Sequence, residues 1–213
     1  AEGHGTKPSD LAPQLAIDIR RIYDDAKESI WAEFDEPFEQ SLPTAIKLKT
    51  QSLDRREYIL RPESGEKLSK DTVKTVRALR DQYAGRYDVQ IIISDGLNAL
   101  SIMDQQQLTP FLQTLRTKLV EERFHVAPEP LVVTAGRVRA GYRIGELLFA
   151  NLPGPRAIVH VIGERPGTGH RTFSVYLTAP QGTLWGDAGK VDHNLTRVVA
   201  GIANTALAPK LAA

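Results

Sequence analysis

Short β-branched runs alternate with amphipathic helical segments along the second half of the chain. The predicted strands cover residues 88–94, 130–134, 157–162 and 173–178. Helices at 105–122 and 138–149 separate them, with leucines or aromatic residues at three- and four-residue spacing. This alternation favours an α/β fold with a mostly parallel, Rossmann-like sheet and helices on both faces. Right-handed crossovers would then bring the ends of successive strands to one edge of the sheet.

The remaining elements are predicted from the same patterns. Helices are expected over residues 11–36, 66–84 and 191–207, a strand over 45–53, and a short pairing segment over 58–60. Prolines at 37 and 43 interrupt the chain before the first strand. We therefore expect an N-terminal helical extension, residues 1–42, followed by an α/β domain, residues 43–213. The apolar stripe of the extension either docks on a partner or packs on its own domain.

Composition excludes several classes of function. The chain has 27 Lys and Arg against 26 Asp and Glu, so no overall charge attracts nucleic acid or an anionic membrane. Cysteine is absent, which excludes disulfides, thiolate catalysis and cysteine-based zinc sites and fits a reducing cytoplasm. No stretch reaches the ~20 apolar residues that span a bilayer. The first ten residues lack the pattern of a secretory signal.

The strand at 157–162 leads into a glycine-rich turn, residues 163–169, with the sequence GERPGTG. A dinucleotide fingerprint is excluded because Gly167 and Gly169 are followed by no third glycine and no helix. A phosphate loop at 186–191 fails because Val191 stands where Ser or Thr must hold magnesium. The turn at 163–169 is either a ligand-binding wall or a structural turn whose charges satisfy backbone groups.

Catalytic constellations are missing from the sequence. Ser94 does not lie in a G-x-S-x-G elbow, and the five histidines form no H-E-x-x-H motif. His160 is expected to be a hydrogen-bonded core residue, and Asp95 either caps the next helix or binds a ligand. We therefore predict no metal site and no catalytic residue, and the residues alone do not support an autonomous enzyme.

Four ordered segments nevertheless carry a specific resemblance. They read LKTQSLDRREYILRPESGEKL (48–68), DVQIIISDGLNALSI (88–102), GRVRAGYRIGELL (136–148) and VHVIGERPGTG (159–169). In this order and spacing they resemble the small subunit of ethanolamine ammonia-lyase, over about residues 45–180 and more loosely 190–207. The resemblance implies a divergent small subunit of an adenosylcobalamin-dependent enzyme that converts ethanolamine to acetaldehyde and ammonia. It implies activity only in a hetero-oligomer with the large subunit, which carries the substrate site.

The resemblance also implies cofactor-binding residues. Val138 matches a corrin-contacting valine and Glu164 a cofactor-binding glutamate, while Arg165, Asp95 and Arg137 are expected to line the same crevice. A third family contact is a cysteine before the last helix. Aligning Asn194 with the family asparagine puts Val191 at that contact, and a one-residue slip puts Asp192 there.

Three further expectations concern the cofactor and the setting. Asp192 and His193 are adjacent, so the D-x-H-x-x-G motif of proteins that supply a histidine to cobalt is absent. We therefore expect adenosylcobalamin in its base-on form. We expect a cytoplasmic protein, either free or within a bacterial microcompartment. The competing interpretations are a non-catalytic cobalamin-binding or scaffolding module and a free-standing α/β enzyme of another substrate.

Overall fold

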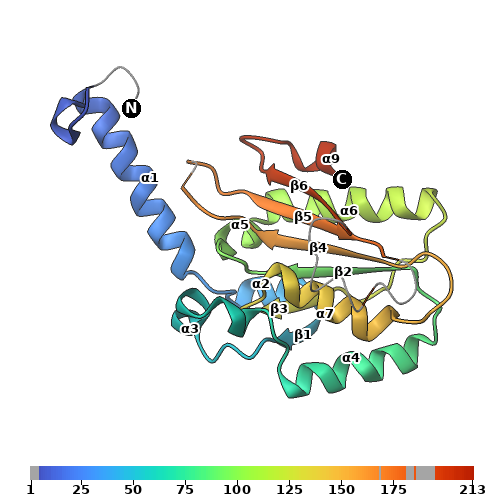
Figure 1. The fold of residues 1–213 in the computed structure, drawn as a ribbon. Coiled ribbons are helices and arrows are strands. Elements are labelled where there is room, and N and C mark those ends of the chain that lie inside the picture. Colours follow the sequence, from blue (N-terminus) through green and yellow to red (C-terminus); the bar gives the residue numbers. More distant parts are fainter. Residues whose placement is uncertain (1–4, 168, 181–184, 186–194) are drawn as a thin grey trace.

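The computed structural model describes residues 5–167, 169–180, 185 and 195–213 (Figure 1). Its strands are β1 (Ile46–Lys49), β2 (Val89–Ser94), β3 (Leu131–Thr134), β4 (Ala157–Gly163), β5 (Phe173–Thr178) and β6 (Thr196–Ile202). They form one six-stranded sheet in the order β1-β3-β2-β4-β5-β6. Three of the five pairings are parallel, and β4 pairs with β5, and β5 with β6, in antiparallel register. The predicted α/β fold is confirmed.

Helices surround this sheet and extend beyond it. The α-helices are α1 (Pro13–Trp31), α2 (Glu36–Ser41), α3 (Arg55–Leu60), α4 (Lys70–Tyr83), α5 (Ala99–Met103), α6 (Gln105–Glu121), α7 (Val138–Phe149) and α9 (Pro209–Ala212). Two 3-10 helices cover Pro8–Asp10 and Pro62–Gly65. No helix in the described part of the chain combines the length and apolarity needed to cross a bilayer.

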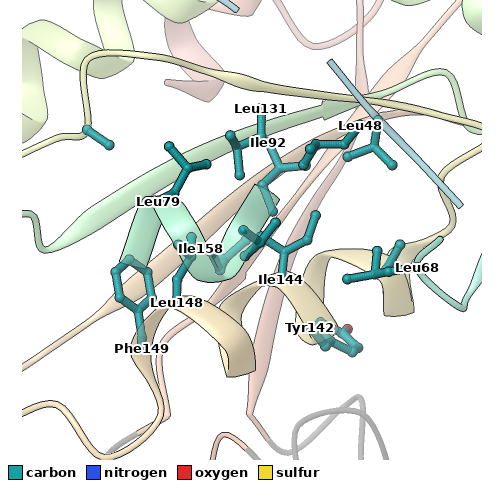
Figure 2. Close-up of a cluster of buried hydrophobic side chains, with 14 of the residues drawn as sticks. Leu48, Leu68, Leu79, Ile92, Leu131, Tyr142, Ile144, Leu148, Phe149 and Ile158 are labelled. Carbon is teal, nitrogen blue, oxygen red and sulfur yellow. The ribbon is translucent and has the colours of Figure 1, made fainter. Parts of the chain in front are cut away.

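The central strands are buried on both faces, which is why their sequences are mostly apolar and do not alternate with exposed polar residues. All six residues of β2 are buried. On one face, α4 and α7 pack a cluster that includes Leu79, Ile144 and Ile92 (Figure 2). On the other face, α6 packs Phe111 against a second cluster with Ile91. Helix α6 precedes β3 and helix α7 precedes β4, the two neighbours of β2, and the two helices lie on opposite faces of the sheet.

Two predicted elements are wrong. The last helix, expected over 191–207, is replaced in its described part by strand β6, which pairs antiparallel with β5. Its β-branched residues Thr196, Val198 and Val199 suit a strand better than a helix. The segment at 58–60 belongs to helix α3 instead of a strand. Asp54 caps this helix by accepting a hydrogen bond from the Glu57 amide at 2.7 Å.

The helix expected over 11–36 ends earlier, at Trp31, and Asp35 caps a separate short helix, α2, that starts at Glu36. Helix α1 protrudes from the domain (Figure 1), and Ser29 is its one buried residue. Its C-terminal half is held by an ion pair between Asp25 and Arg171 at 2.7 Å. Of the apolar stripe, Ile19 and Tyr23 remain 43% and 56% exposed. The predicted stripe therefore packs on the domain only in part.

Candidate functional site

A small pocket lies at the carboxyl ends of β2, β3 and β4, and we call it the strand-end pocket. Its lining residues come from three strand-end loops, α3 and β5: Tyr58, Gly96, Leu97, Arg137, Val138, Ile162, Gly163, Glu164, Arg165 and Tyr176. The strand order reverses around β2, which is where ligands collect in open α/β sheets. Four residues that the sequence predicts for this crevice therefore lie together: Arg137, Val138, Glu164 and Arg165.

The loops at this edge pack backbone to backbone. The Leu97 amide donates to the Gly163 carbonyl at 3.2 Å. A Cβ on Gly163 would lie 2.3 Å from the carbonyl oxygens of Asp95 and Asn98, so only glycine fits there. Gly96 adopts a φ of 56°, in the left-handed region that favours glycine. Glycines thus allow the loops after β2 and β4 to approach closely at the strand-end pocket.

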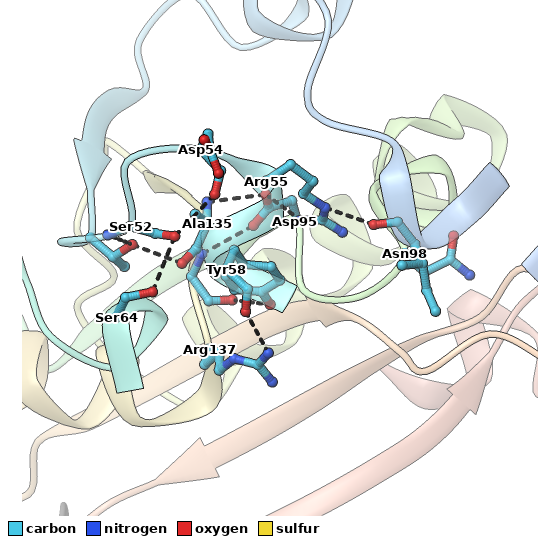
Figure 3. A network of polar contacts seen from close by, with 12 residues as sticks. Ser52, Asp54, Arg55, Tyr58, Ser64, Asp95, Asn98, Ala135 and Arg137 are labelled. Atoms are coloured by element: carbon cyan, nitrogen blue, oxygen red, sulfur yellow. Dashed lines mark hydrogen bonds and ion pairs between the residues drawn. The ribbon is translucent and has the colours of Figure 1, made fainter. Parts of the chain in front are cut away.

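Asp95 lies beneath the pocket, and its carboxylate does not line it. The side chain is 1% exposed and accepts hydrogen bonds from the Ala135 and Gly136 amides at 3.0 and 3.1 Å (Figure 3). Arg55 forms an ion pair with it at 3.1 Å. Burial raises the pKa of Asp95 to about 6, opposed by Arg55 and backbone N–H groups, so the carboxylate is ionised at neutral pH.

The role of Asp95 is therefore to hold other parts of the site in place. It fixes the turn between β3 and α7, from which Arg137 and Val138 enter the pocket. It does not cap α5, because the Asn98 side chain accepts from the Ser101 amide instead. Sequence reasoning missed its partner Arg55, since no local pattern links two positions 40 residues apart.

Arg137 and Tyr58 form one wall of the pocket. The Arg137 guanidinium lies 4.5 Å from the centroid of the Tyr58 ring and donates from Nη2 to the Tyr58 carbonyl at 2.8 Å. Arg55 lies against the same ring at 4.7 Å, and burial raises the pKa of the Tyr58 hydroxyl. Tyr58 escaped sequence prediction, although Asp54 followed three residues later by Glu57 is a helix-start signature that could have placed it.

Glu164 forms the opposite wall. Its backbone amide donates to the Thr172 carbonyl at 3.0 Å, which closes the loop between β4 and β5. Its Oε1 accepts from the Arg165 amide at 2.8 Å, and its Oε2 accepts from the Ser174 hydroxyl. Tyr176 lies beside it, and burial, with a smaller contribution from the Glu164 charge, raises the pKa of the Tyr176 hydroxyl. Sequence reasoning missed Tyr176 and Ser174, which two-residue alternation along β5 places on one face.

The described lining of the strand-end pocket combines charged, phenolic and aliphatic side chains. Its volume is about 110 Å³, whereas pockets that enclose a drug-sized ligand measure roughly 300 Å³ or more. It offers one carboxylate, two guanidinium groups and the aliphatic Val138 and Leu97. Such a surface suits the edge of a larger ligand that carries hydrogen-bonding groups on its rim.

Other described polar groups that the sequence analysis considered lie outside the strand-end pocket. His160 is buried and its Nε2 lies 2.7 Å from the Ser94 hydroxyl, which confirms the predicted core histidine. Burial lowers the pKa of His160 to about 4. The described residues contain no cluster of His, Cys, Asp or Glu suited to a metal ion. Val191 and Asp192 lie outside the described residues.

A larger cavity, about 350 Å³, lies where α1 meets the loop after β4. Arg171 lines it but is already paired with Asp25 and lies 3.6 Å from Glu28. Among the residues that the structure describes, no sequence-predicted cofactor residue lines this cavity. The strand-end pocket is therefore the better candidate, despite its smaller volume.

Comparison with known proteins gives a consistent family. The family model described as Ethanolamine ammonia-lyase light chain (EutC) matches residues 3–213. The chain is 30% identical over 168 residues to the ethanolamine ammonia-lyase small subunit of Pseudomonas fluorescens strain Pf0-1, covering 76% of this chain and 58% of that protein. It is 31% identical to the small subunit of Pseudomonas paraeruginosa strain PA7, covering 76% and 59%. The chain thus spans less than two thirds of the length of these relatives.

Proposed function

The chain belongs to the ethanolamine ammonia-lyase light-chain family, and from that premise we propose that it is the small subunit of an adenosylcobalamin-dependent ethanolamine ammonia-lyase. The supporting observation is the convergence of Val138, Glu164 and Arg165 on one pocket. In this proposal the strand-end pocket holds one edge of the corrin, and a large subunit supplies the ethanolamine site. The product pair is acetaldehyde and ammonia.

The residues of the pocket fit the rim of a corrin. Corrin side chains end in amides, which donate and accept hydrogen bonds. The Glu164 carboxylate has about four acceptor positions, and the Arg165 amide and the Ser174 hydroxyl occupy two of them. Its remaining lone pairs can accept from a ligand amide, and the exposed Arg165 guanidinium can donate to an amide oxygen. Val138 and Leu97 offer aliphatic contacts to the hydrocarbon of the ring.

Binding and exclusion of water are the contributions of this chain. Bound adenosylcobalamin supplies radical chemistry through its cobalt–carbon bond, so the protein needs no acid–base pair at this edge. A pocket of about 110 Å³ covers only part of a corrin. A second surface must cover the rest and keep water from the reacting centre. This is the physical reason to propose a hetero-oligomer with a large subunit as the active species.

The decisive experiment is co-expression with a large subunit, followed by assay of ammonia release from ethanolamine with and without adenosylcobalamin. We expect release that depends on the cofactor. The Glu164→Ala complex should bind cobalamin at least about tenfold more weakly, since a hydrogen bond to a charged group contributes roughly 1.5–3 kcal/mol. The matched control is Glu39→Ala. It removes a carboxylate that is paired with Lys47 and does not line the strand-end pocket, so cobalamin binding should stay unchanged.

The outcomes distinguish a catalytic small subunit from a non-catalytic module. A stable complex that binds cobalamin but releases no ammonia would favour a non-catalytic cobalamin-binding or scaffolding module. Unchanged cobalamin affinity in the Glu164→Ala complex would remove the strand-end pocket from the cofactor site. The base-on state of the cofactor and the contact at Val191 or Asp192 stay predictions, which spectroscopy of bound cobalamin and substitution at those positions would test.

A further inference from the structure

Ser174 is a fully buried hydroxyl residue on β5, directly beside the strand-end pocket. It lies opposite Ile162 in the antiparallel register of β4 and β5. Tyr176, two residues further on the same face, lines the pocket. Ser174 itself is absent from the pocket lining, so it cannot touch a ligand there. Any influence of Ser174 on binding must therefore act through a neighbouring side chain.

The neighbour is Glu164, whose carboxylate is held at both oxygens. The Ser174 hydroxyl donates to Oε2 from the strand, and the Arg165 amide donates to Oε1 at 2.8 Å from the turn. The backbone of Glu164 is fixed as well, through its amide and the Thr172 carbonyl. The two donors, a side-chain hydroxyl and a backbone amide, are both neutral, so neither offsets the negative charge of the carboxylate. Reorienting it would require breaking both hydrogen bonds.

Such an arrangement matters because a free glutamate loses rotamer freedom when a ligand immobilises it. Ordering one rotamer-rich side chain on binding weakens affinity by roughly twofold to tenfold. A carboxylate that is already fixed before binding avoids this cost. We propose that Ser174 is a positioning residue that pre-orients the Glu164 carboxylate towards the cofactor. This role rests on the proposed function, because it assumes that Glu164 faces cobalamin.

The test compares two buried hydroxyl groups on the same strand. Ser174→Ala removes the donor to Glu164. The control Thr178→Val removes a hydroxyl on the same face of β5 that bonds to the Thr196 hydroxyl at 2.9 Å, away from the pocket. Affinity for hydroxocobalamin is measured by difference absorption on the complex with the large subunit. We expect roughly twofold to tenfold weaker binding for Ser174→Ala, because the ligand must then pay for ordering the Glu164 side chain, and an unchanged affinity for Thr178→Val.

A positioning role also predicts two results that a merely structural role does not. In a Glu164→Ala background, Ser174→Ala should cause no further loss of affinity, because the group that it orients is gone. In turnover assays, Ser174→Ala should raise KM for adenosylcobalamin while kcat at saturating cofactor stays unchanged. Equal losses of affinity with and without Glu164 would overturn the inference, as would unchanged binding by Ser174→Ala when Glu164→Ala binds weakly. A wild-type complex that binds no cobalamin would overturn the proposed function and this inference together.

Discussion

The buried ion pair under the strand-end pocket gives the sharpest stability prediction. Asp95→Asn keeps the side-chain shape but removes the charge and turns one acceptor oxygen into a donor. That donor would face the amides of Ala135 and Gly136 or the guanidinium of Arg55, all of which donate to Asp95 in the native protein. Arg55, 5% exposed, would keep its charge in the interior without a carboxylate.

The magnitude follows from these contacts. Breaking a buried ion pair by removing one partner costs about 3–5 kcal/mol, and one unsatisfied buried donor costs roughly 1–3 kcal/mol. The two figures overlap, since they describe the same desolvated groups, so we expect a loss of about 4 kcal/mol in the free energy of unfolding. Most domains have about 5–15 kcal/mol in total. The variant should therefore still fold, but its urea midpoint of unfolding should be much lower than that of the wild type.

Urea unfolding followed by circular dichroism measures this loss. The control is Asp24→Asn, which breaks an exposed pair with Arg20 at 3.7 Å on α1 and should cost less than about 0.5 kcal/mol. The double variant Arg55→Met with Asp95→Asn should lose less than the sum of the single variants, because no buried charge is left unpaired. A loss below about 1 kcal/mol for Asp95→Asn would refute the reasoning.

Three more predictions test the packing around α7. Gly141→Ala should destabilise by about 1–3 kcal/mol although alanine favours helices, because its Cβ would lie 2.4 Å from the His160 ring; thermal unfolding that shows a gain would contradict this. The pKa of His160 falls from 6.5 to about 4 on folding. Between these two pH values the unfolded chain binds a proton that the folded chain does not, so the free energy of unfolding should fall as the pH is lowered from 6.5 to about 4. Relative to His160→Gln, wild type should lose about 3 kcal/mol across that window in urea titrations, and parallel pH profiles would contradict it. Arg80→Met should cost about 1–2 kcal/mol, since Arg80 donates to two carbonyls at the C-terminal end of α7; the exposed Arg77→Met is the control, and equal losses would argue against a capping role.

The central sheet was predictable because its signals are local. The run at 88–94 is rich in β-branched residues, and its residues Val89–Ser94 form β2, which is buried at every position. Connections between parallel strands are right-handed, and this rule alone predicted that the loops at 95, 136 and 164 lie together at one edge of the sheet. The boundary near residue 42 stays a prediction.

The contacts that build the site were not predictable in the same way. Arg55 reaches Asp95 across 40 positions, and no periodicity relates them. Ser174 reads as an ordinary strand residue until the register of β4 and β5 is known. The segment that contains β6 has apolar residues at spacings that also fit a helix, and pairing with β5 decided its structure. Tertiary contacts, absent from any local window, determined all three.

The strand-end pocket lies where the parallel part of the sheet meets the antiparallel part, and this has a consequence for folding kinetics. Gly96 and Val138 follow parallel strands, whereas Glu164 and Tyr176 belong to β4, β5 and their short connection. Neighbouring antiparallel strands can pair within microseconds, while parallel pairing such as Val89 with Ala157 must first close a long loop. The pocket is complete only after this slower pairing. Ligand binding during refolding should therefore lag behind the return of strand content.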